Sequence, residues 1–274
     1  MKAIQIVAFD LDGTLLDSSK NISERNIRAL ARCAEKGIHV VPTTGRPMDG
    51  VPKRIQDLPG VRYAITTNGG AIVDLEAGRQ LMSRALSPEK AVELLQIAKH
   101  YDVMADPYID GRAVTEAHCL SQLPHYRLDE AMQAMVRDTR DVVPDVVEYV
   151  RQTGKYVEKI NVFFANSDDR AALRSRLERE SGIVITAALA NNLELNHENA
   201  TKGNGLMWLA DYLGVDRSAT LALGDGENDV SMIRMAGVGV VMENAPDSVK
   251  QYADEITLTN DEDGVAAALE RLIG

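Results

Sequence analysis

Two aspartates, Asp10 and Asp12, follow a short apolar run over residues 4–9 and are separated by one leucine. Such a run is typical of a buried strand, and Gly13 gives the backbone the freedom to turn sharply away from a sheet. Open α/β sheets bind their ligands at the carboxyl ends of strands, so two acids there can react with a substrate or hold a cation. Aspartate is also a common turn residue, and the rest of the chain must decide between the two interpretations.

Two further apolar runs also end in polar residues. Residues 38–41 precede Thr43 and Thr44, and residues 220–223 precede a GDGEND segment that contains Asp225, Asn228 and Asp229. The carboxyl ends of parallel strands meet at one edge of a sheet, so we expect these side chains to converge with the first two acids. Crowded carboxylates repel one another by on the order of several kcal/mol, so the cluster needs a cation. Oxygen ligands without histidine or cysteine favour a hard ion, Mg²⁺ before Ca²⁺.

The elements that must position these residues alternate between strands and helices. The spacing predicts helices over residues 21–36 and 202–213, with Ser23 as the N-cap of the first. Residues 63–66 are expected to add a third strand to the sheet, and residues 71–73 to return from it as a hairpin. This alternation is typical of a doubly wound, Rossmann-like parallel α/β sheet.

The middle of the chain follows a different pattern. The turn signal Asp110-Gly111 separates two strand-like runs, and further strands and helices follow up to residue 195. Hairpins mixed with helices predict an α+β domain with an antiparallel sheet. The expected domains are a discontinuous catalytic core, residues 1–83 and 194–274, and an inserted cap domain, residues 84–193.

The composition argues against several classes of protein. The 274 residues contain 30 Lys and Arg against 41 Asp and Glu, a formal net charge of −11, without a run of basic residues. This charge repels nucleic acid and anionic membranes, so we expect neither as a partner. No apolar run approaches the roughly 18 residues of a membrane span, and the N-terminus leads into a strand rather than a signal peptide. A soluble, cytoplasmic protein is expected, and its oligomeric state is not predicted.

Four motifs occur in order along the two core segments. DLDGT begins at Asp10, TTGR at Thr43, TKG at Thr201 and GDGEND at Gly224. Together they resemble the motifs of the haloacid dehalogenase-like superfamily. Their placement around a central insert is similar to that in Cof-type sugar-phosphate phosphatases with a large α/β cap. The resemblance implies Mg²⁺-dependent hydrolysis of a phosphomonoester, with a small phosphorylated metabolite such as a sugar phosphate as the substrate.

The resemblance also implies roles in catalysis and metal binding. Asp10 corresponds to the nucleophile that forms an aspartyl phosphate, and Asp12 to the general acid and base. Mg²⁺ is expected to be held by Asp10, by the main-chain carbonyl of Asp12 and by Asp225. The residues expected to orient this metal shell are Asn228 and Asp229, and the sequence does not predict whether either contacts the ion directly.

Other motif residues are implied to bind the substrate. Thr44, Gly45 and Lys202 correspond to residues that bind the phosphate group, and Lys202 also offsets the charge of the nucleophile. Arg46 and Asn68 resemble positions near the substrate.

Two other functions remain open at this stage. A phosphomutase of the same superfamily would return the phosphoryl group to a second hydroxyl group. A catalytically idle protein would only bind a phosphorylated ligand, although such a protein has no need of Asp10, Asp12, Lys202 and Asp225 together.

Overall fold

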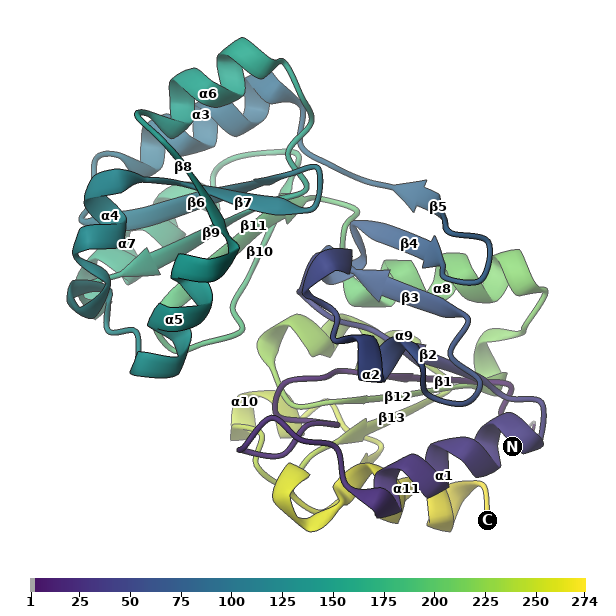
Figure 1. Ribbon diagram of the computed structural model, residues 1–274. Helices are drawn as coiled ribbons and strands as arrows, with labels where there is room; N and C mark the ends of the chain where they lie inside the picture. Colours follow the sequence, from purple (N-terminus) through teal and green to yellow (C-terminus); the bar gives the residue numbers. More distant parts are fainter. Residues whose placement is uncertain (1–2) are drawn as a thin grey trace. The chain divides into compact units, whose positions relative to one another are not determined.

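The computed structural model describes residues 3–274, which form two compact units (Figure 1). Unit 1 combines the chain up to Ser83 with Ala200–Gly274, and unit 2 is Arg84–Asn199. No helix within residues 3–274 is long and apolar enough to cross a membrane.

The core of unit 1 is a parallel sheet of β1 (Ile6–Phe9), β2 (His39–Pro42), β12 (Thr220–Gly224), β13 (Val238–Val241) and β14 (Glu255–Ile256). The spatial order is β14-β13-β12-β1-β2, and every neighbouring pair is parallel. The chain runs from β1 to β2 on one side and later reaches β12 on the other side. The carboxyl end of β1 therefore lies at a topological switch point, where sheets of this kind bind ligands.

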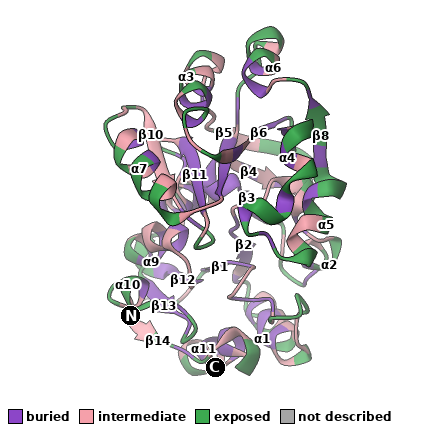
Figure 2. Cartoon of the chain, turned by 90° about the vertical axis from the view of Figure 1, so that its left-hand side faces the viewer, coloured by how far each residue is buried: buried purple, intermediate pink, exposed green. Residues whose placement is uncertain are grey.

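Helices cover both faces of this sheet: α1 (Glu24–Glu35), α2 (Lys53–Gln56), α8 (Lys202–Leu213), α9 (Val230–Met235), α10 (Asp247–Lys250) and α11 (Gly264–Leu272). Alternate residues of a strand point to opposite faces. Val7 and Phe9 pack with α1 and α11, whereas Ile6 and Ala8 pack with α8 and α9. Figure 2 shows the buried strands between these helices. The predicted doubly wound parallel sheet is confirmed.

Residues 63–66 form a strand, but in a different sheet from the one predicted. A separate antiparallel sheet contains β3 (Tyr63–Thr66), β4 (Ala71–Asp74) and β5 (Arg79–Ser83). The turn η2 (Thr67–Gly69) has positive φ at all three residues and folds β4 directly back onto β3. β4 thus pairs along the whole of β3. An isolated parallel bridge between Thr43 and Ile65 and the hydrogen bond from the Thr44 N–H to the Ile65 carbonyl oxygen, at 2.8 Å, also link β3 to the segment after β2.

Unit 2 is built on a sheet of β6 (Val103–Ile109), β7 (Arg112–Glu116), β8 (Arg140–Val143), β9 (Lys159–Phe164), β10 (Ile183–Thr186) and β11 (Asn192–His197). The order is β10-β11-β9-β6-β7-β8, and the pairs are antiparallel except β7 with β8. Asp110 and Gly111 both have positive φ and form the predicted turn between β6 and β7. The α+β prediction for this region is confirmed.

The helices of unit 2 are α3 (Pro88–Ala98), α4 (Ala117–Ser121), α5 (Glu130–Thr139), α6 (Val146–Thr153) and α7 (Ser167–Leu177). Apolar residues of α3, α6 and α7 pack on one face of the sheet, against Ile160, Val162 and Phe164. The sequence pattern missed the elements between residues 117 and 155. The apolar signal of α5 is weak, since this helix buries a single residue, Val136, whereas α6 buries three valines that the pattern still missed.

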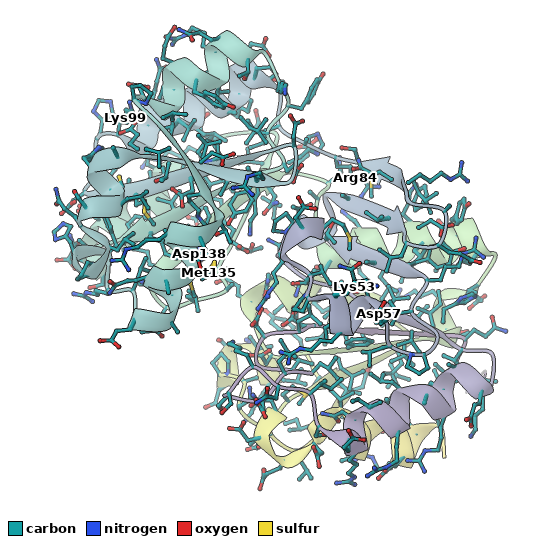
Figure 3. The ribbon with its side chains drawn as sticks, viewed as in Figure 1. Lys53, Asp57, Arg84, Lys99, Met135 and Asp138 are labelled. Carbon is teal, nitrogen blue, oxygen red and sulfur yellow. The ribbon has the colours of Figure 1, made fainter. Side chains whose placement is uncertain are left out.

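The second unit ends at Asn199, later than the predicted boundary at residue 194. β11 explains the difference, because it pairs with β9 in the sheet of unit 2. The two ends of unit 2 are also joined directly, since Arg84 Nη1 donates to the carbonyl oxygen of Asn199 at 2.6 Å (Figure 3 labels Arg84).

Candidate active site

β1 and β12 bring two of the predicted acids to the same edge of the parallel sheet. The strands pair with Phe9 opposite Leu223, and Asp10 and Asp225 follow these residues. The backbone N–H of Asp10 donates to the carbonyl oxygen of Leu223 at 3.0 Å, which extends the ladder by one residue. Asp10 is buried, with 6% of its surface exposed.

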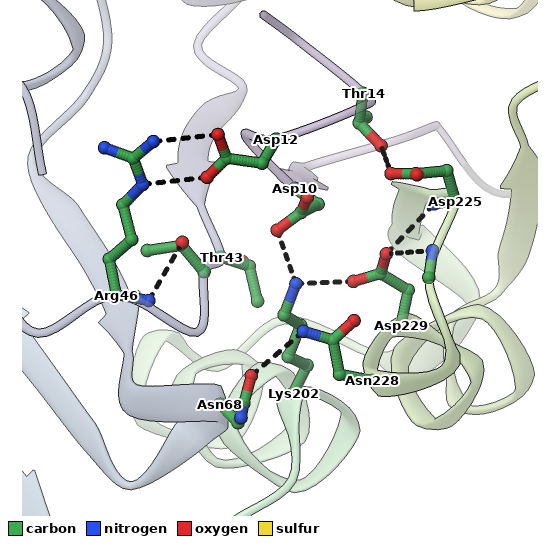
Figure 4. A network of polar contacts seen from close by, with 12 residues as sticks. Asp10, Asp12, Thr14, Thr43, Arg46, Asn68, Lys202, Asp225, Asn228 and Asp229 are labelled. Atoms are coloured by element: carbon green, nitrogen blue, oxygen red, sulfur yellow. Dashed lines mark hydrogen bonds and ion pairs between the residues drawn. The ribbon is translucent and has the colours of Figure 1, made fainter. Parts of the chain in front are cut away.

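Lys202 joins this edge from the start of α8. Thr201 caps the helix, because its hydroxyl oxygen accepts the N–H of Asn204 at 3.1 Å. The Lys202 side chain is fully buried, and its Nζ donates to Asp10 Oδ1 and Asp229 Oδ1 at 2.5 Å each (Figure 4). A cation is unfavourable at a helix N-terminus, so these two carboxylates supply the charge that keeps Lys202 there.

The segment after β12 is folded around the carboxylate of Asp229. Its Oδ2 accepts the N–H groups of Asp225 and Gly226 at 2.9 Å each (Figure 4). A Cβ at Gly224 would lie 2.4 Å from the Asp229 Cβ, so a glycine is required for this close approach. Both oxygens of Asp229 are thus engaged, one by Lys202 and the other by the two amides.

Asp225 is positioned by the turn that follows β1. The Thr14 hydroxyl donates to Asp225 Oδ1 at 2.8 Å, and Thr14 is fully buried. Gly13 has a φ of +86°, and a Cβ there would lie 2.4 Å from Asp225 Oδ2. No role was predicted for Thr14 from the sequence. The signal that could have found it is its place in DLDGT, directly after the turn glycine.

Negative charge is in excess in this part of the site. Oxygen atoms of Asp10, Asp225 and Asp229 lie within 4.8 Å of one another, and Lys202 is the cation that contacts this group. Burial raises the pKa of Asp10 well above its usual range, although Lys202 opposes the shift. Burial and the neighbouring Asp229 carboxylate raise the pKa of Asp225 to about 7. Burial alone would lower the pKa of Lys202, but Asp10 and Asp229 outweigh it and raise that pKa, so the lysine is charged.

The excess negative charge of these three carboxylates favours a hard divalent cation beside them. Two ionised carboxylates about 5 Å apart repel by on the order of 3 kcal/mol at an effective dielectric constant of about 20, and a divalent cation would remove this repulsion. The ligand atoms are all oxygen, which favours Mg²⁺ over a transition metal. Within residues 3–274, this is the one group of three acidic, histidine or cysteine side chains arranged to hold an ion.

Asp12 is engaged by two cations. Arg46 Nε and Nη2 each donate to one of its carboxylate oxygens at 2.8 Å, and Lys20 Nζ donates to Oδ1 at 2.9 Å (Figure 4 shows the Arg46 contacts). Burial would raise the pKa of Asp12, but Arg46 and Lys20 outweigh it and lower that pKa to about 2. Arg46 is held in turn by the carbonyl oxygen of Gly50 at 3.0 Å. Arg46, predicted to lie near the substrate, therefore holds Asp12 as a carboxylate in this structure.

The segment after β2 carries the predicted phosphate-binding residues. The Thr44 hydroxyl accepts the N–H of Arg46 across Gly45 at 3.1 Å. The Thr44 carbonyl oxygen accepts the N–H of Asn68 at 3.0 Å, and Asn68 Oδ1 accepts from Asn228 Nδ2 at 3.1 Å (Figure 4). These contacts connect the ends of β2 and β3 to the loop after β12.

Comparison with known proteins decides the family. The model of the haloacid dehalogenase-like hydrolases matches residues 7–269 of this chain. The chain belongs to this family. The hydrolase is 29% identical to phosphatase YwpJ of Bacillus subtilis, over 98% of this chain and 100% of YwpJ. It is 30% identical to 5-amino-6-(5-phospho-D-ribitylamino)uracil phosphatase YwtE of the same organism, over 98% of each chain.

The fold agrees with this assignment. A solved haloacid dehalogenase-like hydrolase from B. subtilis superposes on the hydrolase with a TM-score of 0.86 at 28% identity, covering 98% of this chain and 100% of that chain. The resemblance to Cof-type phosphatases, drawn from four short motifs, is confirmed. The hydrolase is an enzyme of the phosphatase class.

Proposed function

We propose that the hydrolase is a Mg²⁺-dependent phosphomonoesterase that acts on a small phosphorylated metabolite. The observation that carries the proposal is the group of Asp10, Asp225 and Asp229 around the Lys202 ammonium, at the carboxyl edge of β1 and β12. A phosphate dianion cannot approach three carboxylates unless cations offset their charge. This edge therefore has to bind both a divalent cation and the phosphate group that is transferred.

Asp10 is the nucleophile in this mechanism. In the first step an Asp10 carboxylate oxygen forms a bond to phosphorus, the bond between phosphorus and the ester oxygen breaks, and the departing alkoxide takes a proton from Asp12. In the second step a water oxygen bonds to phosphorus, its proton passes to Asp12, and the bond between phosphorus and Asp10 breaks. The products are an alcohol and inorganic phosphate.

Asp12 has to serve first as an acid and then as a base. Its ion pairs with Arg46 and Lys20 favour the carboxylate, which is the form needed for the second step. The acid of the first step carries a proton, so Asp12 has to leave Arg46 when the substrate binds. Arg46 and Lys20 are then available to the negatively charged substrate, which is consistent with the predicted place of Arg46 near it.

Asp10, the main-chain carbonyl of Asp12, and Asp225 are the groups proposed to hold Mg²⁺. When bound, Mg²⁺ withdraws charge from a phosphoryl oxygen and offsets the repulsion between carboxylate and phosphate. Asp229 has both oxygens engaged within the protein, so we assign it to orienting this set rather than to binding the ion. Asn228, held by its contact with Asn68 in the same edge, has the same supporting role.

The phosphate group itself needs donors that face it. The Lys202 ammonium already contacts Asp10, so it can stabilise charge on the nucleophile and on the incoming phosphoryl oxygens. The Thr44 hydroxyl and the backbone N–H of Gly45 lie in the turn after β2 and are proposed as further donors to phosphate. Their roles are binding and orientation, since none of them exchanges a proton in the two steps.

The alcohol part of the substrate is proposed to be a small hydroxylated metabolite, such as a sugar or a polyol. The relative YwtE is named for 5-amino-6-(5-phospho-D-ribitylamino)uracil, a phosphate ester of a polyol chain. The net charge of −11 supports a small free ester rather than a nucleic acid. We infer that the enzyme encounters this ester in the cytoplasm. A charged phosphate ester does not readily cross a membrane, because a charge is costly in the bilayer, so it stays in the compartment where it is made.

A phosphate-release screen tests the class and the substrate together. The protein is incubated with Mg²⁺ and a panel of sugar phosphates, polyol phosphates, nucleotides and phosphorylated cofactor precursors, and inorganic phosphate is measured. Asp10→Asn is the matched control, because it keeps the size of the side chain and removes the nucleophilic carboxylate. Equal release by the two proteins would contradict the role of Asp10, and full activity in a chelator would contradict the role of the metal.

The same screen separates a phosphatase from the two alternatives. A phosphomutase would convert its substrate into an isomer without steady release of inorganic phosphate. An idle binding protein would be stabilised by its ligand and would release no phosphate from it. Sustained phosphate release that Asp10→Asn abolishes is the outcome expected of a phosphatase.

A further inference from the structure

Side chains near the C-terminus hold the loop that follows β1. Asn244 Nδ2 donates to the carbonyl oxygen of Gly13 at 2.8 Å, and Asn260 Nδ2 donates to the carbonyl oxygen of Leu16 at 3.0 Å. The two asparagines are joined, because Asn244 Oδ1 accepts the backbone N–H of Asn260 at 3.0 Å. The two contacts with the loop, from Asn244 to Gly13 and from Asn260 to Leu16, each join residues of unit 1 that are more than 200 positions apart in the sequence.

Asp261 adds a third contact to this loop. Its carboxylate accepts the N–H of Ser18 at 2.7 Å and the Ser18 hydroxyl at 2.6 Å. We call Asn244, Asn260 and Asp261 the C-terminal clamp. All three residues lie outside the DLDGT, TTGR, TKG and GDGEND motifs, so no role was predicted for them from the sequence.

The clamp acts on the backbone that packs against Asp225. The carbonyl group held by Asn244 belongs to Gly13, whose α-carbon is so close to Asp225 that a Cβ would lie 2.4 Å from Oδ2. The next residue, Thr14, donates its hydroxyl to Asp225 Oδ1 at 2.8 Å. The hydrogen bond from Asn244 therefore reaches the peptide group between Gly13 and Thr14, the two residues that lie against the Asp225 carboxylate.

The loop has other means of staying folded. Leu15 and Leu16 are 0% and 1% exposed and belong to the apolar cluster between the sheet, α1 and α11. Asn244 is exposed, and an exposed hydrogen bond adds little to the stability of a fold. Gly13 is the residue of the loop with the greatest backbone freedom, so it gains most from an external contact that fixes its carbonyl group.

We propose that Asn244 is a positioning residue for Asp225 and, through it, for the divalent cation of the active site. The proposal rests on the proposed function only in that Asp225 is taken to hold the cation. Residues that orient metal ligands typically change metal affinity or activity by about 10- to 100-fold when they are replaced. The C-terminal segment thus supplies a contact that completes the metal edge of the site.

The first test compares wild type with Asn244→Ala. We expect the Mg²⁺ dissociation constant, measured by calorimetry without substrate, to rise about 10-fold, and kcat to fall by about the same factor. The KM of the best substrate from the screen should change less than about 2-fold, because Asn244 donates to Gly13 and accepts from Asn260, and neither is a proposed phosphate-binding residue. In the metal-free protein, peptides over residues 11–18 should exchange amide hydrogens faster, with the melting temperature lowered by no more than about 4 °C.

A matched control separates positioning from the general loss of an exposed contact. Gln251→Ala removes another exposed amide side chain of unit 1, whose Nε2 donates to the carbonyl oxygen of Ser248 at 2.8 Å. This variant should bind Mg²⁺ as tightly as wild type. Unchanged Mg²⁺ affinity in Asn244→Ala, or an equal loss in Gln251→Ala, would overturn the proposal.

A double-mutant cycle tests whether Asn244 acts through the Thr14–Asp225 contact. Thr14→Val keeps the shape of the side chain and removes its donor to Asp225. If both residues position the same carboxylate, Asn244→Ala should add less than about 2-fold to the loss of Mg²⁺ affinity in Thr14→Val. Losses that multiply independently would overturn the coupling. Should Asn244→Ala fail to fold, Asn260→Ala replaces it, with a smaller loss of Mg²⁺ affinity expected and an unchanged affinity counting against the clamp.

The two proposals fail in different ways. If wild-type protein binds Mg²⁺ and releases no phosphate from any ester, the proposed function is wrong while the calorimetry and hydrogen exchange still test the clamp. If wild type is an active phosphatase and Asn244→Ala matches it in Mg²⁺ affinity, kcat and hydrogen exchange, the clamp alone is wrong.

Discussion

Both units bury charged side chains, but they balance them differently. In unit 2, Arg140 Nε donates to Asp106 at 3.1 Å and Lys159 Nζ donates to Glu194 at 2.5 Å, and all four side chains are at most 4% exposed. Both cations also lie over the ring of Tyr108, at 5.5 and 5.0 Å from its centre. Each of these cations contacts a carboxylate, so the four buried charges sum to zero. We call these four residues the balanced group.

In unit 1 the buried charges do not cancel. Asp10, Asp225 and Asp229 gather around Lys202, so three carboxylates face one ammonium group. A balanced pair is complete without a ligand, whereas an unbalanced group is stable only when a cation binds or a proton is taken up. Burial of charge is therefore common to both units, and the excess of one sign distinguishes the group that we propose as the active site.

The largest effect is expected when Asp10, the proposed nucleophile in the unbalanced group, is replaced. Asp10→Asn should lower phosphate release by at least about 1,000-fold, because the amide cannot form the phosphoryl intermediate. Turnover is measured on the best substrate from the screen, with circular dichroism to check that the variant is folded. Near-normal turnover by a folded Asp10→Asn protein would remove the main functional distinction between the two groups.

The next effect concerns the balanced group in unit 2. Glu194→Gln should lower the free energy of unfolding by about 3–5 kcal/mol, because it leaves the buried Lys159 ammonium without its carboxylate. Urea denaturation measures the loss, and hydrogen exchange of peptides from β9 and β11 places it in unit 2. The double variant Lys159→Met/Glu194→Leu removes both charges and should recover most of the loss. A single variant as stable as wild type would show that the pair is not balanced in the way described.

In the metal-free protein, removal of one acid from the unbalanced group should not lower the free energy of unfolding, in contrast to the loss expected for Glu194→Gln. Asp225→Asn should be at least as stable as wild type in a chelator, because one of three crowded carboxylates becomes neutral. Mg²⁺ at 100 times its dissociation constant should stabilise wild type by about 2.7 kcal/mol and leave Asp225→Asn unchanged. Thermal unfolding with and without Mg²⁺ measures both effects. An equal gain in the two proteins would place the ion elsewhere.

The smallest effect is expected at an exposed ion pair. Arg112 Nη2 donates to Asp141 at 2.9 Å in unit 2, and the two side chains are 49% and 54% exposed. Arg112→Ala should lower the free energy of unfolding by less than about 1 kcal/mol, since solvent screens the charges. Urea denaturation of Arg112→Ala and Glu194→Gln under the same conditions compares the two losses of unfolding free energy. A loss as large as that of Glu194→Gln would show that burial does not set the energy of these pairs.

Local sequence patterns were sufficient for many individual elements. α8 begins at Lys202 and ends before Gly214, as predicted, because Thr201 caps its start and Gly214 takes a left-handed φ of 68° at its end. β3 was also predicted with its observed bounds and with a strand that returns beside it as a hairpin, which β4 confirms. The separation of this hairpin from the parallel sheet was not predicted, because it depends on how the segments pack in three dimensions.

The candidate site, like the fold, was predicted from the sequence only in part. The residue types of Asp10 and Asp225, each just after an apolar run, were enough to predict that acids would meet at one edge of a parallel sheet. The order of four motifs was enough to predict the family and the phosphatase class. The engagement of Asp12 by Arg46 and Lys20, the contact of Lys202 with Asp229, and the clamp on Gly13 were not predicted.

The sequence alone determined which side chains stand at the ends of strands and helices, because caps, turns and hydrophobic periodicity depend on neighbours in the chain. Only the tertiary structure decided which charges pair. Lys202 reaches Asp10 across 192 residues and Asn244 reaches Gly13 across 231 residues, and such contacts depend on how helices and strands pack. The excess of negative charge at the end of β1 is therefore a property of the packed core, although each of its carboxylates is visible in the sequence.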